Sequence, residues 1–249
     1  MQTWNAETYL KNAHFVPVLG QPVLELLNPL PHERILDLGC GDGTLTELLA
    51  SKCGEVVGVD ASAEMIAAAR ARGLDARVLN AKALNFESEF DAVFSSAVLH
   101  WVKDDPDAPI SGVFRALKSK GRFVAEMGGH GCVAAISTAL LAVLERRGVR
   151  QPASVIPWYF PTVAEYQRRL QSAGFVVESI QLIPRPTPLP TGMRGWLETF
   201  ANPFCGALPA ESRSEFLDEV TALLKPTLCD NEGNWTADYM RLRFRAIKV

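Results

Sequence analysis

Residues 35–44, Ile35-Leu36-Asp37-Leu38-Gly39-Cys40-Gly41-Asp42-Gly43-Thr44, form the stretch that decides the fold of this 249-residue chain. An apolar run reaches an aspartate, turns through three glycines and enters residues 45–50, whose apolar positions have helical spacing. This pattern predicts a buried parallel strand, a tight loop and a helix. Glycine adopts backbone angles that other residues avoid, and its missing side chain lets a ligand lie against the main chain. We therefore expect a ligand in the crevice that the first amides of the helix also face.

The spacing of the glycines separates two kinds of nucleotide ligand. A dinucleotide-binding loop has the pattern G-x-G-x-x-G and accommodates a pyrophosphate, whereas this loop has the spacing Gly39-x-Gly41-x-Gly43. It also carries Asp37 and Asp42, whose negative charges would repel a pyrophosphate. These carboxylates suit a cationic ligand with an ammonium and a sulfonium group. The loop therefore predicts S-adenosylmethionine (SAM) as the ligand.

Four segments, taken in order, resemble the motifs of the class I SAM-dependent methyltransferases. They are residues 35–44, 56–60, 79–86 and 90–101. Within this class the chain resembles the trans-aconitate methyltransferase-like group. The resemblance implies an α/β fold with a Rossmann-like, seven-stranded, mostly parallel sheet whose last strand is antiparallel, with helices on both faces and a small helical cap.

The domain organisation is predicted from the same reading. An N-terminal helical segment, residues 1–30, is expected over the cofactor site, and residues 31–249 are expected to form the SAM-binding domain. A strand is predicted over residues 175–183, and four alternating prolines after it predict an extended linker. These are Pro184, Pro186, Pro188 and Pro190. A cap is then expected at about residues 188–232, before a last strand over residues 237–249.

Candidate cofactor ligands lie where the predicted strands end, because ligands of open α/β sheets sit beyond the carboxyl ends of the strands. Asp60 ends the strand over 55–60 and is expected to accept from the ribose hydroxyls, since Ser62 can cap the next helix. Asn80 stands where the resembling family commonly has Asp, and its amide oxygen still accepts hydrogen bonds. Met65 packs either on the adenine or in the core. The predicted cofactor-binding residues are Asp37, Gly39, Cys40, Gly41, Gly43, Asp60, Ala61, Met65, Asn80, Ala81, Ser96 and Ala97.

The acceptor side is predicted from the loop after the fourth strand and from the last strand. His100 is the candidate catalytic base for a hydroxyl or carbon acceptor, and the alternative is a packed pair with Trp101 that does no chemistry. Arg241 is the candidate for bidentate pairing with a carboxylate, and the alternative is an arginine at the surface or against a helix. The residues predicted to contact the acceptor are Tyr9, His100, Trp101, Trp158, Tyr239 and Arg241.

The predicted reaction is methyl transfer to a small molecule, with O-methylation of a carboxylic acid as the leading hypothesis. Two alternatives stay open: C- or O-methylation of an apolar secondary metabolite, and SAM binding without turnover. No metal-ligand cluster is evident in the sequence. A formal net charge of −3 gives no general attraction to nucleic acid or to an anionic membrane surface.

The location of the protein is predicted from its cysteines and its apolar runs. The five cysteines form no C-x-x-C pair, which is typical of reduced thiols. We see no signal peptide and no apolar run of membrane-spanning length. A cytoplasmic protein is therefore expected, as a monomer or homodimer.

Overall fold

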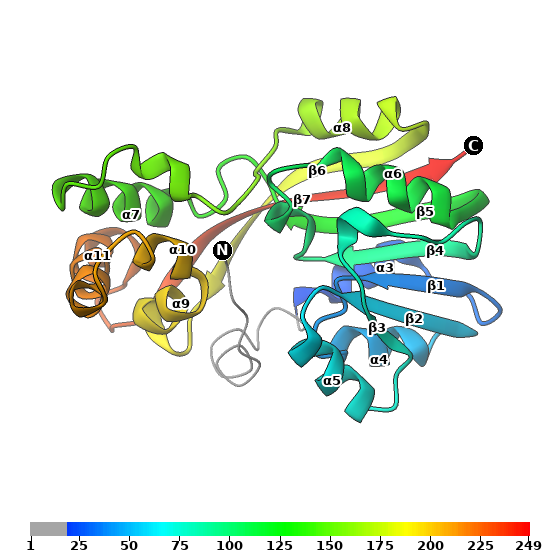
Figure 1. Cartoon of the computed structure of the whole chain (residues 1–249), viewed down its shortest axis with the longest axis horizontal. Coiled ribbons are helices and arrows are strands. Elements are labelled where there is room, and N and C mark those ends of the chain that lie inside the picture. Colours follow the sequence, from blue (N-terminus) through cyan, green and yellow to red (C-terminus); the bar gives the residue numbers. More distant parts are fainter. Residues whose placement is uncertain (1–18) are drawn as a thin grey trace. The chain divides into compact units, whose positions relative to one another are not determined.

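The computed structural model describes residues 19–249 and contains a seven-stranded sheet (Figure 1). The strands are β1 (Arg34–Leu38), β2 (Glu55–Asp60), β3 (Ala76–Val78), β4 (Phe90–Ser96), β5 (Leu117–Gly128), β6 (Phe175–Pro188) and β7 (Thr236–Lys248). Their order across the sheet is β3-β2-β1-β4-β5-β7-β6. Strands β1 to β5 pair in parallel, and β7 runs antiparallel to β5. The predicted fold class is confirmed.

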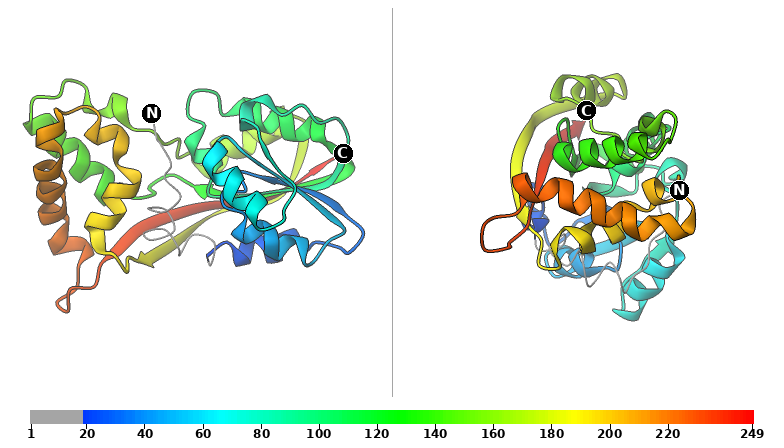
Figure 2. Two further views of the ribbon diagram at one scale, coloured as in Figure 1. Left: turned by 60° about the horizontal axis from the view of Figure 1, so that its bottom comes forward. Right: turned by 90° about the vertical axis from the view of Figure 1, so that its left-hand side faces the viewer.

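Helices cover both faces of the sheet because alternate residues of each buried strand point to opposite sides. Helices α3 (Gln21–Leu27) and α4 (Thr44–Ala50) pack on one face with Ile35 and Phe94. Helices α6 (Asp107–Ala116) and α8 (Val163–Ser172) pack on the other face with Leu36 and Phe123. Figure 2 shows these two pairs of helices on opposite sides of the strands. Within residues 19–249, no helix combines the length and apolar character that a bilayer span needs.

Short elements at the strand ends complete the part of the chain that surrounds the glycine loop. Helix α5 (Ala63–Ala71) begins as predicted, since the Ser62 hydroxyl accepts the Met65 amide at 3.3 Å. A 3₁₀ turn, η1 (Ala81–Ala83), follows β3, and a second, η2 (Leu99–Trp101), follows β4.

The chain divides into two compact units, which we call the sheet unit and the helical unit. The described part of the sheet unit is residues 19–130, 159–183 and 241–249, and that of the helical unit is residues 131–158 and 184–240. The helical unit contains α7 (Ala134–Arg146), η3 (Pro152–Val155), α9 (Gly192–Phe200), α10 (Asn202–Cys205), η4 (Ala210–Ser212) and α11 (Arg213–Leu228). The predicted boundaries, 1–30, 31–249 and a cap at 188–232, remain predictions.

The segment with alternating prolines differs from the prediction. A linker was expected from residue 184 onwards, but β6 continues to Pro188. Alternate residues of a strand direct their amides to the same side, and β6 is an edge strand of the sheet. Prolines at every second position can therefore all have their missing N–H on the open side of the strand. An edge strand tolerates this, because that side makes no hydrogen bonds to a neighbouring strand.

Candidate functional site

The glycine loop lies at the point where the strand order reverses. From β1 the chain proceeds through β2 to β3, and it returns with β4 on the other side of β1. In open α/β sheets such a switch point creates a crevice at the carboxyl ends of the strands. The loops after β1 and β4 adjoin here, because a Cβ on Gly39 would lie 2.1 Å from Cγ2 of Val98.

The three glycines of the loop have positive φ angles but different surroundings. The φ values of Gly39, Gly41 and Gly43 are 78°, 55° and 84°. A Cβ on Gly39 would collide with Val98, and one on Gly43 would lie 2.5 Å from Leu74. A Cβ on Gly41 would meet no protein atom within 4 Å. Gly39 and Gly43 therefore serve the close packing of the loop, while Gly41 opens onto free space where a ligand can approach the backbone.

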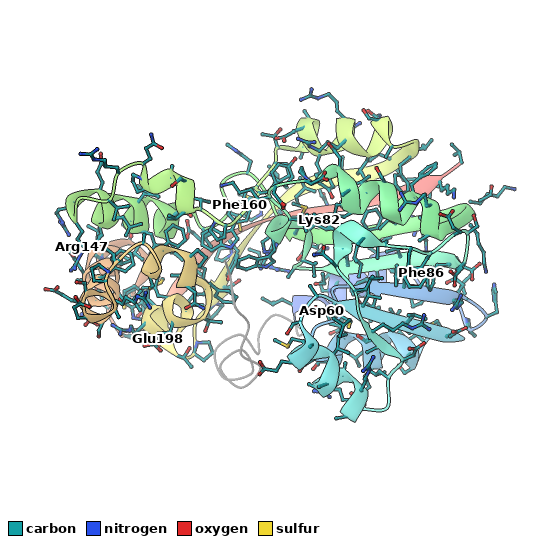
Figure 3. All side chains as sticks on the ribbon, in the orientation of Figure 1. Asp60, Lys82, Phe86, Arg147, Phe160 and Glu198 are labelled. Atoms are coloured by element: carbon teal, nitrogen blue, oxygen red, sulfur yellow. The ribbon has the colours of Figure 1, made fainter. Side chains whose placement is uncertain are left out.

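Asp60, which is labelled in Figure 3, places a carboxylate next to Gly41, where the Cβ position is open. Its Oδ2 accepts the Gly41 amide at 3.1 Å, and its Oδ1 accepts the Ser62 amide at 2.8 Å. Each oxygen keeps a further lone pair, so the group can still accept two hydroxyl donors. Burial raises the pKa of Asp60, against the backbone hydrogen bonds, which lower it. The orientation of the carboxylate is thus fixed by two backbone amides, those of Gly41 and Ser62.

The other two loop carboxylates differ in their surroundings. Asp37 is buried and its Oδ2 accepts the Thr46 hydroxyl at 2.7 Å. Burial raises the pKa of Asp37 to about 7, the Thr46 hydrogen bond lowers it, and the negative charge of Asp60 adds to the rise. Asp42 is engaged by Thr44 at 2.9 Å and by Arg72 at 3.4 Å. The arginine offsets the charge of Asp42, and the raised pKa leaves Asp37 only partly ionised at neutral pH, so Asp60 is the carboxylate best suited to favour a cationic ligand.

The remaining predicted cofactor residues line the ends of β1 to β4. Cys40, Met65 and Ala81 are buried, whereas Ala61 is exposed and Ser96 half-buried. The Asn80 oxygen accepts the Lys82 amide at 2.9 Å, which starts η1 and leaves one lone pair for a donor. The amide of Ala97 donates to the Glu126 carbonyl at 2.8 Å.

A second group of predicted residues gathers where β4, β5 and β7 meet. Nδ1 of His100 accepts the Gly128 amide at 3.2 Å, and Gly128 is the register partner of Arg241 in the antiparallel β5–β7 pair. His100 is 6% exposed and Arg241 is 3% exposed. Burial and then the positive charge of Arg241 hold the pKa of His100 well below its usual value. Gly128 was not among the predicted site residues, because a backbone amide leaves no mark in the sequence.

Neighbouring chain segments hold His100 in place. The Tyr159 amide donates to the His100 carbonyl at 2.8 Å, and the Phe160 ring centroid lies 5.8 Å from that of His100. The Tyr159 hydroxyl donates to Glu165 at 2.7 Å and accepts from Arg169 at 2.8 Å, which ties this segment to α8. The proline-bounded aromatic stretch over residues 152–161 reads either as packing or as part of an acceptor site, but Trp158 alone was predicted to contact the acceptor, and not Tyr159 or Phe160.

The other predicted acceptor contacts are placed differently. Trp158 belongs to the helical unit, where its ring centroid lies 5.5 Å from Phe204 and 6.2 Å from Trp196. Tyr239 belongs to the same unit, and its hydroxyl accepts the Trp196 indole N–H at 2.6 Å. Trp101 is half-buried beside His100, at 5.4 Å between ring centroids. Tyr9 lies outside the described residues.

Three features define a Rossmann-like fold with a nucleoside crevice. They are the sheet order, the glycine loop with its open backbone position, and the fixed acid at the end of β2. Residues 36–125 match a protein family that is described as a methyltransferase domain. An uncharacterized methyltransferase of Schizosaccharomyces pombe is 42% identical over 98% of this chain and 98% of its own length. A trans-aconitate 2-methyltransferase of Mycolicibacterium gilvum is 32% identical over 89% of each chain.

The same fold occurs in a solved structure with bound cofactor. The phosphoethanolamine N-methyltransferase 2 of Haemonchus contortus in complex with SAM is 22% identical, with a TM-score of 0.59 over 93% of this chain and 52% of that chain. The chain therefore belongs to the family of SAM-dependent methyltransferases. Its cofactor is SAM, whose sulfonium supplies an electrophilic methyl group. The open position at Gly41 and the anchored carboxylate of Asp60 fit this cofactor.

We expect the substitution Gly41→Ala to weaken SAM binding at least roughly tenfold, which corresponds to about 1.4 kcal/mol. The new Cβ would fill the space that the cofactor needs, whereas no protein atom lies within 4 Å of it. The fold should lose only about 1–2 kcal/mol, because alanine is strained at positive φ. Calorimetric titration with SAM and denaturation of the free protein measure the two effects separately.

Gly148→Ala is the matched control. Gly148 also has a positive φ, 82°, and open space around its Cβ position, but it follows α7 in the helical unit. This variant should show a similar loss of stability with unchanged SAM affinity. Wild-type affinity in Gly41→Ala would mean that the cofactor does not approach the backbone at Gly41.

Proposed function

We propose that the protein transfers the methyl group of SAM to a carboxylate oxygen of a small carboxylic acid. The observation that carries this proposal is the buried Arg241, which lies in register with Gly128 at the carboxyl end of β5. A guanidinium presents parallel N–H donors that match the two oxygens of a carboxylate. A buried guanidinium at the edge of the sheet where the cofactor binds is thus suited to hold an acidic acceptor.

The chemistry of a carboxylate acceptor also agrees with the surroundings of His100. A carboxylate is already an anion at neutral pH, so its methylation needs no general base. His100 is neutral, because burial and the charge of Arg241 hold its pKa low. The similarity to a trans-aconitate 2-methyltransferase, an enzyme named for an acidic substrate, supports the same class of acceptor. Positioning of the acceptor against the methyl group can supply most of the rate acceleration.

The cytoplasmic location is part of this proposal. All five cysteines are free thiols in the structure, as is usual in a reducing compartment.

The proposal is tested by incubating the purified protein with SAM and a panel of mono-, di- and tricarboxylic acids and phenols. Methyl esters are detected by mass spectrometry. We expect at least one acid to be converted and the substitution Arg241→Met to raise the KM for that acid about 10- to 100-fold, the value of a charge-assisted hydrogen bond. Arg241→Lys should fall between Arg241→Met and wild type, because lysine keeps the charge and loses the planar fork.

Arg245→Met is the control on the same strand. Arg245 pairs with Glu178 at 2.6 Å and donates to the Leu26 carbonyl at 3.1 Å, four residues beyond Arg241. This variant should keep the wild-type KM for the acid, and every variant should keep its SAM affinity. An unchanged KM in Arg241→Met would remove the proposed carboxylate contact. Turnover of phenols without any acid would favour an apolar acceptor instead.

A further inference from the structure

His100 is held by two backbone amides from different parts of the sheet unit. Its carbonyl accepts the Tyr159 amide at 2.8 Å, and its ring nitrogen Nδ1 accepts the Gly128 amide at 3.2 Å. The rings of Trp101 and Phe160 lie beside it. The imidazole therefore has an orientation that the fold fixes, rather than one that it could choose freely at a surface.

The contact with Gly128 determines which ring nitrogen carries the proton. A backbone N–H only donates, so the nitrogen that accepts it has no proton of its own. In a neutral imidazole the proton then sits on Nε2. Protonation of Nδ1 would break the Gly128 hydrogen bond and place a second positive charge beside Arg241. The ring nitrogen that remains for a ligand is consequently a donor and has no lone pair for a proton.

We infer that His100 donates a hydrogen bond from Nε2–H to the carboxylate of the acceptor and does not act as a general base. This inference rests on the proposed function, because it requires an acceptor that is an anion before the reaction. One carboxylate oxygen attacks the methyl carbon, the carbon–sulfur bond breaks towards sulfur, and a neutral ester and a neutral thioether result without proton transfer. The other oxygen remains available to the Nε2–H group and to Arg241.

The charges around His100 explain why its protonation should not appear in the pH profile. The guanidinium of Arg241 acts on the ring from β7. The neighbours from η2 and from the segment after Trp158 are the uncharged rings of Trp101 and Phe160. Burial and the Arg241 charge both favour the neutral ring. The rate should therefore show no step from His100 between about pH 6 and pH 9, around the usual histidine pKa of about 6.5.

Two amide substitutions separate a donor from a base. Glutamine places an amide N–H near the position of Nε2, whereas asparagine places its amide near that of Nδ1. Neither amide is basic. We expect His100→Gln to keep kcat and the acceptor KM within about tenfold of wild type, and His100→Asn to raise the acceptor KM about 10- to 100-fold. If His100 were the base, both variants would lose kcat alike.

A nuclear magnetic resonance measurement tests the tautomer without any acceptor. ¹⁵N spectra of the histidine-labelled wild-type protein with S-adenosylhomocysteine should show one ring with its proton on Nε2 that does not titrate between about pH 6 and pH 9. The His100→Gln spectrum identifies this ring by its loss. A proton on Nδ1 would overturn the inference whatever the substrate. An Nε2 proton together with no conversion of any acid would instead contradict the proposed function, and the contact to a carboxylate with it, while the tautomer of His100 would stand.

Discussion

Replacing Glu33 by alanine is expected to lower the free energy of unfolding by about 3–5 kcal/mol, because it leaves a buried arginine without its anion. Glu33 is 6% exposed and Arg122 is 9% exposed, and the two pair through both carboxylate oxygens, at 2.5 and 2.7 Å. The same guanidinium donates to the carbonyls of Leu27 and Asn28, at 2.7 and 3.0 Å, where α3 ends. Equilibrium denaturation of the free protein measures the change.

Asp75→Ala is the matched control, since it also breaks a bidentate arginine–carboxylate pair. Asp75 accepts from Arg77 at 2.7 and 3.2 Å, but the two side chains are 47% and 46% exposed. Solvent screens such a pair, so its loss should cost less than about 1 kcal/mol. Equal losses in the two variants would show that burial of the Glu33–Arg122 pair does not determine its contribution.

The Glu33 pair also predicts how stability depends on pH. Burial raises the pKa of Glu33, but hydrogen bonds from Arg122 and from the Leu30 amide outweigh it, and the net shift is downward. A carboxyl group whose pKa is lowered in the folded state stabilises the fold at pH values above its pKa in the unfolded chain, which is about 4.3. This contribution is lost as the pH falls through the lower pKa of the folded state. The difference in stability between wild type and Glu33→Ala should thus be large at about pH 7 and shrink below about pH 4.

The sequence predicted the elements whose signals are local. The bounds of β2 agree with those expected, β1 occupies the apolar run before the glycine loop, and Ser62 caps α5 as predicted. In both strands an apolar run ends at an acid or a glycine, and the next helix starts after a short loop. The strand β6 was predicted too short, because prolines usually end a strand and only the position of β6 at the sheet edge removes that penalty.

The contacts that decide the properties of the site join distant parts of the chain. Glu33 and Arg122 are 89 residues apart, and His100 and Gly128 are 28 residues apart. Pattern reading placed His100 at the end of β4, but it could not show that a backbone amide from β5 occupies Nδ1. The role of His100 as a base therefore stays a prediction, and the hydrogen bond from Gly128 to Nδ1 is the observation that favours the donor role inferred above.

Replacing Asp60 by alanine is expected to weaken SAM binding about 100- to 10,000-fold. We predict that this carboxylate accepts both ribose hydroxyls, and each hydrogen bond to a charged group contributes about 1.5–3 kcal/mol. The amides of Gly41 and Ser62, which Asp60 accepts at 3.1 and 2.8 Å, would lose their partner as well. Asp60→Asn should be less severe, because its remaining oxygen can still accept, while its NH₂ group faces one of the two amide donors. Calorimetric titration with SAM gives both values.

Asp75→Asn provides the comparison for the loss of a charge without the loss of a ligand contact. Asp75 stands just before β3 and is exposed, whereas Asp60 ends β2 beside the open position at Gly41. If Asp60 acted only as a structural acceptor for the two amides, its substitution would lower stability while SAM affinity, measured on the folded fraction, stayed at the wild-type value. If Asp60 contacts the ligand, the loss of SAM affinity should instead exceed the loss of stability. The ratio of the two losses in Asp60→Asn therefore decides whether this carboxylate holds the sugar or only the loop.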